Sequence, residues 1–305
     1  MRIVCLVENT PGKAGLPCEH GLSFYIETKK HKVLMDTGAS DLFVKNAEAL
    51  NIDLAKVDTV VISHGHYDHG GGLAAFLALN HTAKVYIRAS AFDDYYSLNH
   101  EPVKYIGLDK ELESHPQMVF LKDDTYRIDE SLFLFAGMAN ENLPSANKAL
   151  RKGDTLEQDD FGHEQCLAVT EDGTRVLFSG CAHHGILNIM ERWQQLRKKD
   201  PDLVISGFHM MKKNGYDDDD INMIIDTALQ LKTYESRFLT CHCTGKAPYE
   251  AMKKIMGNKL DYIHCGDEVI LAKKKGNTYM KFHKLFAWGT VFCFAMTMLT
   301  GYRRK

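Results

Sequence analysis

The feature that most constrains this chain is the stretch VVISHGHYDHGGG, which occupies positions 60–72. A run of apolar, β-branched residues predicts a buried strand, and His64, His66, Asp68 and His69 follow within six positions. On an extended segment, residues two apart share a face, so His64 and His66 can bind one metal ion. Asp68 and His69 come after a turn, and their donors suit a second ion roughly 3.5–4 Å from the first.

Three later strands also end in histidines. RVLFSG leads to His183 and His184, LVISG leads to His209, and RFLT leads to His242. Because the ends of neighbouring strands meet at one rim of a sheet, we expect these side chains to face the same site. Packing alone does not explain histidines at so many strand ends, and the sequence therefore predicts a metal centre.

The order of strand and helix patterns predicts an α/β fold. In both halves of residues 1–272, short strands come first and alternating strands and helices follow. Two sheets packed face to face with helices outside, a four-layer αβ/βα sandwich, would satisfy this pattern in one domain. We expect a helical insertion or lid at 90–127 and a loop at 141–162. Apolar spacing predicts helices at 41–50, 71–80, 186–199, 218–232 and 247–256.

The net charge and the N-terminal residues indicate which partners and which cellular compartment to expect. The formal net charge of −3 provides no basic surface for nucleic acid. The opening MRIVCLVENT is typical of a strand and not of a signal peptide, so a cytoplasmic protein with reduced cysteines is expected. A small-molecule substrate is therefore the expected partner, and the sequence carries no indication of oligomeric state.

The C-terminal segment differs from the rest of the chain. Residues 273–305 combine a basic connector with eighteen uncharged residues at 285–302, flanked by lysines and arginines. This apolar length just reaches that of a membrane-spanning helix. Two interpretations stay open, a membrane anchor and a helix packed on the domain or on a partner.

Several motifs together resemble the metallo-β-lactamase fold superfamily. The His-x-His-x-Asp-His cluster follows LMDTG at 34–38, and the other motifs are CEHGLSFYIET, FGHEQCLAV, SGCAHHGILNIMERW, ISGFHM and CHCTG. Within the superfamily, this set resembles the branch of dihydropterin-ribofuranosyl-aminobenzene-phosphate synthase-like proteins. The resemblance covers about residues 1–271.

The resemblance implies a ligand set for two metal ions. His64 and His66 would bind the first ion, with His163 as its third histidine. Asp68 and His69 would bind the second ion together with His242.

One position departs from the family pattern. The strand-end aspartate that usually bridges the two ions is replaced by Cys181, with His183 two residues later. Either Cys181 ligates as a thiolate, which would favour zinc, or His183 enters the ligand set and Cys181 is structural.

The resemblance also implies roles around the ions. Asp36 would orient the metal-binding loop, and Glu19 and His20 would border the site. His209 would contact substrate or donate a proton, and Asp68 would orient a metal-bound hydroxide that acts as the nucleophile.

The expected function is that of a metal-dependent hydrolase with two divalent ions. Zinc is the expected metal, and manganese or iron would suit the same donors. The branch implies a small phosphorylated or pterin-like substrate. Two alternatives stay open, an iron-dependent oxidoreductase on the same scaffold and a non-catalytic metal-binding module.

Overall fold

Two mixed β-sheets lie face to face in the computed structural model, which describes residues 1–12, 15–274 and 277–283. The first sheet has the strand order β19-β18-β1-β2-β3-β4-β5-β8. Its strands are β1 (Arg2–Val7), β2 (Ser23–Glu27), β3 (Lys32–Met35), β4 (Thr59–Val61), β5 (Lys84–Arg88), β8 (Met118–Leu121), β18 (Glu268–Lys274) and β19 (Asn277–His283).

The second sheet has the order β17-β16-β15-β14-β13-β10-β9, and strands β14 to β17 are parallel. Its strands are β9 (Thr125–Arg127), β10 (Leu132–Phe135), β13 (Cys166–Glu171), β14 (Thr174–Phe178), β15 (Leu203–Ser206), β16 (Arg237–Thr240) and β17 (Leu260–Tyr262).

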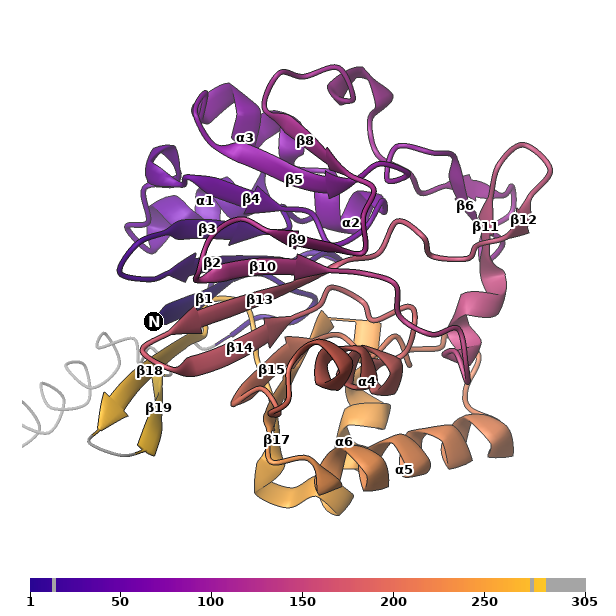
Figure 1. The fold of residues 1–305 in the computed structure, drawn as a ribbon. Coiled ribbons are helices and arrows are strands. Elements are labelled where there is room, and N and C mark those ends of the chain that lie inside the picture. The colour runs from indigo at the N-terminus through magenta and orange to yellow at the C-terminus, as the bar shows by residue number, and fades with distance from the viewer. Residues whose placement is uncertain (13–14, 275–276, 284–305) are drawn as a thin grey trace, which may run out of the picture.

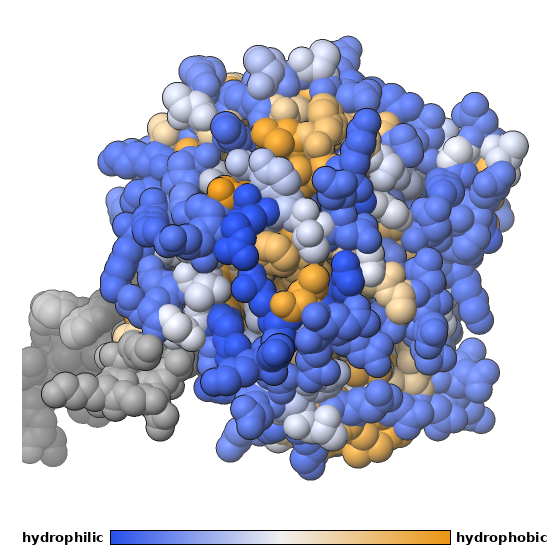
Figure 2. All heavy atoms as spheres, viewed as in Figure 1, coloured by the Kyte–Doolittle hydropathy of each residue, from blue (hydrophilic) through white to orange (hydrophobic). Residues whose placement is uncertain are grey.

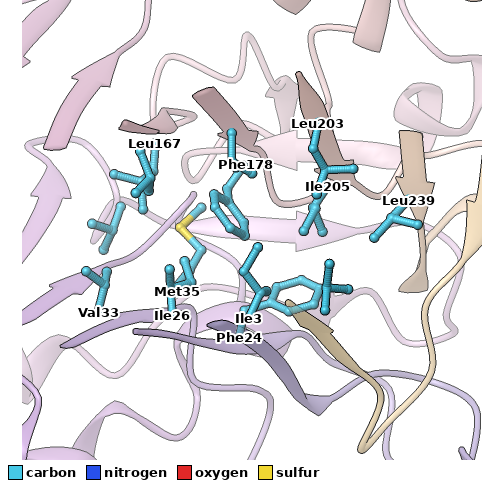
Figure 3. Close-up of a cluster of buried hydrophobic side chains, with 14 of the residues drawn as sticks. Ile3, Phe24, Ile26, Val33, Met35, Leu167, Phe178, Leu203, Ile205 and Leu239 are labelled. Atoms are coloured by element: carbon cyan, nitrogen blue, oxygen red, sulfur yellow. The ribbon is translucent and has the colours of Figure 1, made fainter. Parts of the chain in front are cut away.

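The central core fills the space between these two sheets. Figure 3 shows Phe24 and Met35 of the first sheet pointing toward Phe178 and Ile205 of the second. The rings of Phe24 and Phe178 have centroids 6.2 Å apart. Burying each such side chain stabilises the fold by about 1.5–3 kcal/mol, so this layer holds the sheets together.

Helices cover the outer face of each sheet, as Figure 1 shows. Helices α1 (Leu42–Ala49) and α3 (Leu73–Leu79) pack Phe43 and Phe76 against the first sheet. The second sheet is covered by α4 (Ile186–Leu196), α5 (Asp218–Thr233) and α6 (Lys246–Met256), which bury Trp193, Leu231 and Met252. The predicted four-layer sandwich and its helices are confirmed.

The region predicted to be a helical insertion or lid at 90–127 instead contains four short strands and one 3₁₀ helix, η2 (Lys110–Leu112), among turns, so the expectation of helix was wrong. β6 (Tyr95–Ser97) and β7 (Lys104–Tyr105) join a small third sheet, and β8 and β9 extend the two large sheets. The loop predicted at 141–162 contains the 3₁₀ helix η3 (Ser145–Ala149) and two strands of the third sheet, β11 (Leu150–Lys152) and β12 (Glu157–Gln158). Pairing between β6 and β11 stabilises strands too short to show a pattern of their own.

Strand pairing continues into the segment predicted to be a connector. β18 runs to Lys274, and β19 at Asn277–His283 pairs antiparallel with it at the edge of the first sheet. The apolar stretch 285–302 lies outside the described residues. Within the described ranges, the helices are too short or too polar to span a bilayer.

The ends of four strands place the motif residues at one site. β4 of the first sheet leads to His64, and β14, β15 and β16 of the second lead to His183, His209 and His242. The third sheet lies beside this end of the sandwich in Figure 1. Figure 2 shows that the face seen from the same side is mostly hydrophilic, with hydrophobic residues in small groups.

Candidate metal centre

A tight turn after β4 brings the histidine cluster into the site. An added Cβ at Gly65 would lie 2.3 Å from the carbonyl oxygen of Ala91, so only glycine fits there. The short helix α2 (Tyr67–Gly70) follows and carries Asp68 and His69. The sequence had predicted a turn here, and one turn of helix gives the two side chains their separate direction.

One set of donors, which we call the four-donor group, consists of Asp68, His69, Cys181 and His242. Nε2 of His69 lies 3.1 Å from Sγ of Cys181 and 3.3 Å from Nε2 of His242. Oδ2 of Asp68 lies 3.3 Å from Nε2 of His242 and 3.8 Å from Nε2 of His69. These donors converge on one point and could hold a metal ion.

A second set, the three-histidine group, consists of His64, His66 and His183. Nε2 of His64 lies 3.2 Å from Nε2 of His183. Nε2 of His66 is buried and makes no hydrogen bond to another described residue. The two groups are adjacent, because the ring centroids of His64 and His69 are 4.1 Å apart.

A carboxylate and a hydroxyl orient the histidines that follow β4. Nδ1 of His69 lies 2.6 Å from Oδ2 of Asp36. Ser63 donates its hydroxyl to the same carboxylate at 2.7 Å, and its Oγ lies 2.9 Å from Nδ1 of His64. Each histidine therefore carries its proton on Nδ1 and leaves the Nε2 lone pair free.

Two asparagines hold the later histidines in the same way. Oδ1 of Asn9 lies 2.7 Å from Nδ1 of His242, and its Nδ2 donates to the backbone oxygen of His242 at 3.2 Å. Oδ1 of Asn147 lies 2.9 Å from Nδ1 of His183, and its Nδ2 donates to the backbone oxygen of His183 at 2.7 Å. Since each amide nitrogen is donating, the amide oxygen accepts from Nδ1, and Nε2 is again unprotonated.

Two buried glutamates complete these clamps. Glu8 accepts the backbone N–H of His242 at 3.0 Å, and Glu164 accepts that of His183 at 2.7 Å. Neither the two asparagines nor the two glutamates were predicted from the sequence to be site residues. Glu8 and Asn9 follow β1, so their position at a strand end was the one available signal.

The arrangement of lone pairs fits a cation in each group. Nε2 atoms of His64 and His183 face each other without a proton between them, and so do those of His69 and His242. Burial, with the neighbouring imidazoles, keeps the pKa of His64 and His183 well below the usual range. Such facing lone pairs repel unless a positive charge lies between them.

Negative charge favours a cation in the four-donor group. Burial lowers the pKa of His69, but the carboxylates of Asp36 and Asp68 outweigh it and raise that pKa. Burial raises the pKa of Asp68, but His69, His20 and His242 bring it well below its usual range. The negative charges that favour a proton on His69 would also stabilise a metal ion in this group.

Cys181 and His183, the two candidates to take the place of the missing bridging aspartate, both lie at the metal centre. Cys181 lies in the four-donor group, His183 lies in the three-histidine group, and the two also form a further set of possible donors with His209. His163 is placed differently, because its Nδ1 accepts from the N–H of Gly65 at 2.9 Å and its Nε2 lies 3.1 Å from Oδ2 of Asp159. His163 also belongs to a further set of possible metal donors with His66 and Asp159, so its predicted role as a ligand stays a prediction.

The remaining predicted residues surround the two groups. His20 lies 3.3 Å from Oδ2 of Asp68 through Nε2. Glu19 accepts hydrogen bonds from Ala39, Ser40 and the Ser40 hydroxyl, and so supports the loop after β3. His209 has its ring centroid 4.2 Å from that of His183, and its buried Nδ1 makes no hydrogen bond within the described chain.

A cleft of about 860 Å³ opens above both groups. Its lining includes His66 and His183 of the three-histidine group, Asp68 and Cys181 of the four-donor group, and His209. The third sheet, η3 and the loop at 211–214 form the sides. Four lysines lie along these sides: Lys104, Lys148, Lys212 and Lys213.

Curated relatives match most of the chain. An uncharacterized protein of Methanocaldococcus jannaschii is 27% identical over 269 residues, covering 87% of this chain and 98% of the relative. The 7,8-dihydropterin-6-methyl-4-(beta-D-ribofuranosyl)-aminobenzene-5'-phosphate synthase of the same organism is 24% identical over 266 residues, covering 81% and 88%.

Solved structures and a family model agree on the fold. The crystal structure of Tm1679, described as a metal-dependent hydrolase of the beta-lactamase superfamily, aligns with a TM-score of 0.74 at 30% identity, covering 90% of this chain and all of that one. Zn(2+)-bound PqqB from Methylobacterium extorquens shares the fold, with a TM-score of 0.51 at 12% identity over 89% of this chain and all of that one. The model of the metallo-beta-lactamase superfamily matches residues 16–217. The chain belongs to the metallo-beta-lactamase superfamily.

Proposed function

We propose that this chain is a metal-dependent hydrolase that binds two divalent ions, with zinc as the expected metal, and acts on a small phosphorylated or pterin-like molecule. The observation that carries the proposal is the pair of adjacent donor groups beneath one cleft. The 30% identity to a structure described as a metal-dependent hydrolase supports it.

The donor groups suit hydrolytic chemistry. The four-donor group would hold one ion and the three-histidine group the other. When bound, such ions lower the pKa of water and polarise the bond under attack. Asp68 borders the cleft within reach of His20, and we assign it the orientation of the attacking water. His209 lines the cleft with an unpartnered Nδ1, and we assign it proton transfer to the leaving group.

The sides of the cleft favour an anionic substrate. Lys212 is paired with Asp220, and Lys104 lies 4.2 Å from the ring centroid of Tyr67. None of the ion pairs among the described residues involves Lys148 or Lys213. Two such ammonium groups at the side of the cleft could bind a phosphate group of the substrate, away from the bond that is cleaved.

The cleft also offers surface for an aromatic ring. Leu98 and Met211 are each about 40% exposed and line the cleft with Tyr67. A flat ring system could pack between these side chains, as a pterin-like substrate requires. The name of the Methanocaldococcus jannaschii synthase supports this substrate class, because that relative is matched along most of its length.

Activity assays with defined metals test the proposal. Metal-free protein is reconstituted with zinc, manganese or iron and assayed with phosphate mono- and diesters, thioesters and lactones. We expect hydrolysis that is lost on chelation and restored by metal. A chelator-insensitive activity, or no hydrolysis with any metal, contradicts the proposal. Iron-dependent oxygen consumption with a visible absorption band would favour the oxidoreductase alternative.

A charge variant tests the substrate class separately. Lys148→Ala combined with Lys213→Ala is expected to raise KM about tenfold or more for a phosphorylated substrate and to leave its kcat little changed. Lys84→Ala, on an exposed residue of β5, is the matched control. An equal KM in both proteins rejects a role for these lysines in phosphate binding.

A further inference from the structure

We propose that helix α5 pairs with α5 of a second copy of this chain, antiparallel and around a two-fold axis at Ile225. The helix runs along the lower edge of the molecule in Figure 1, outside the second sheet. Figure 2 shows hydrophobic residues at that edge in the same view. The pairing goes beyond the proposed function and does not depend on it, because α5, described over its whole length, supplies no donor to either group.

Three large apolar side chains of α5 are exposed at intervals of four residues. Ile221, Ile225 and Leu229 are 44%, 37% and 51% exposed. Since an α-helix turns about 100° per residue, the three side chains leave the helix within about 80° of one another. Exposed apolar residues that are scattered singly are ordinary, but a row on one side of a helix is typical of a helix that packs against a partner.

The exposed row adjoins the face that α5 buries in its own domain. Ile224, Ala228 and Leu231 are buried in the core outside the second sheet. The polar residues Asn222 and Asp226 bound the row on its other side and are exposed. The apolar sector of α5 is therefore wider than the part that its own domain covers. Burying the remainder against a second helix would remove apolar surface from water, which favours association.

The order of residues along α5 is self-complementary when the helix is reversed. A two-fold axis at Ile225 places this residue against its own copy and pairs positions that are equally distant from it in opposite directions. Ile221 and Leu229 each lie four positions from Ile225, so they meet across the axis. Asp218 and Lys232 each lie seven positions from it, so they meet at the two ends of the row. The centre of the paired helices is therefore apolar, and both ends join opposite charges.

The charges at the ends of the row favour a second copy as the partner. Asp218 and Lys232 are exposed, and among the side chains that the structure describes neither forms an ion pair. The capping box at the start of α5 uses Asp217 and Asp220, so it does not occupy the Asp218 carboxylate. Seven positions are nearly two helical turns, which places both charges on the same side as Ile225. A parallel pairing would oppose like charges at each end, so the charges select the antiparallel arrangement.

Exchanging the two charges tests the pairing in the full-length chain. Sedimentation velocity over a range of concentrations measures the Kd of the dimer. Asp218→Lys and Lys232→Asp each oppose like charges at both ends and should raise that Kd roughly tenfold or more. An equimolar mixture of the two variants should associate as tightly as wild type, because every end again joins opposite charges. Glu48→Lys, at an exposed residue of α1, makes the same change in charge and should leave the Kd unchanged.

A cysteine on the proposed axis tests the geometry. With diamide as the oxidant, Ile225→Cys should form a disulfide between two copies, because the two thiols meet at the axis. Asp226→Cys is the matched control, since this exposed position points about 100° away and should not cross-link. Wild type, treated in the same way, gives the background from its own eight cysteines.

Several outcomes would overturn the pairing. A wild-type chain that stays monomeric up to its solubility limit would exclude it. Association that is equal in wild type and both charge variants would place the contact elsewhere, for instance in the apolar stretch 285–302. A mixture that fails to associate would contradict the charge pairing, and cross-linking at position 226 in preference to 225 would contradict the axis. Thermal unfolding checks that each variant is folded. Since no turnover is measured, the outcome is distinct from that of the proposed function.

Discussion

Asn9 holds His242 at two points: its Oδ1 lies 2.7 Å from Nδ1, and its Nδ2 lies 3.2 Å from the backbone oxygen. Asn147 does the same for His183, at 2.9 and 2.7 Å. One of these histidines lies in the four-donor group and the other in the three-histidine group. A neutral amide therefore sets the tautomer in both groups, where a carboxylate would have added negative charge.

Removing an amide clamp should weaken metal binding. We expect Asn9→Leu to lower metal affinity about 10- to 100-fold, because His242 loses the partner that fixes its orientation and tautomer. Competition with a chelator measures the affinity, and imidazole ¹⁵N shifts in metal-free protein report the tautomer. Asn80→Leu is the control, since Asn80 is a buried asparagine that donates to the backbone of Leu54, Ala55 and Val57. Equal metal affinity in Asn9→Leu and wild type would refute the clamp.

Replacing Gly180 with alanine should disturb the metal centre, because the added methyl group would be too close to Ser63. Its Cβ would lie 2.2 Å from Oγ of Ser63 and 3.2 Å from Nδ1 of His64. Ser63 must then move, and the contact that orients His64 is lost. We expect Gly180→Ala to reduce metal content and thermal stability together, as measured by elemental analysis and calorimetry.

The matched control for Gly180 is Gly162→Ala. The nearest atom to its added Cβ is a carboxylate oxygen of Asp160 at 3.5 Å, which is ordinary van der Waals contact. This variant should retain full metal content. Equal metal content in both variants would argue against the steric explanation.

Stability should depend on pH through His31, which lies away from the metal centre. Burial lowers the pKa of His31, but hydrogen bonds to Asp129 and Asp58, both at 2.9 Å, outweigh it and raise that pKa above 6.5. The protonated histidine is therefore favoured in the folded state. Its contribution is fully present below about pH 6.5, the unfolded pKa, and is lost as pH rises through the folded pKa.

The test compares His31→Gln with wild type across that pH range. At saturating metal, urea unfolding at pH 5.5 should show wild type more stable than the variant, and the difference should shrink as pH rises to 9. A difference that stays constant over the range would exclude the ionic contribution.

The core between the two sheets should contribute to the free energy of unfolding independently of the metal centre. Phe178 is fully buried beside Phe24, so Phe178→Ala should lower the free energy of unfolding by about 3–5 kcal/mol. Phe120→Ala removes a ring that is 38% exposed and should cost less. Denaturant unfolding measures both variants. Equal losses would show that Phe178 does not pack as Figure 3 indicates.

Local patterns in the sequence were sufficient for much of the fold. The strand that ends before His64 and the helix at 218–232 were predictable, because a short apolar run and the helical spacing of apolar residues act over a few residues. In the structure, α5 begins with a capping box between Asp217 and Asp220. The third sheet was missed, because strands of two or three residues acquire their structure only from their partners.

The sequence by itself determined that this chain would present histidines and an aspartate at strand ends, since that follows from local pattern alone. The tertiary structure decided how they are grouped. Asn9 and His242 are 233 positions apart, and His69 and Cys181 are 112 apart. Such pairs meet only when two sheets pack against each other and bring their strand ends to one side. No local pattern encodes that contact, so the four-donor group and the three-histidine group became visible only in the folded chain.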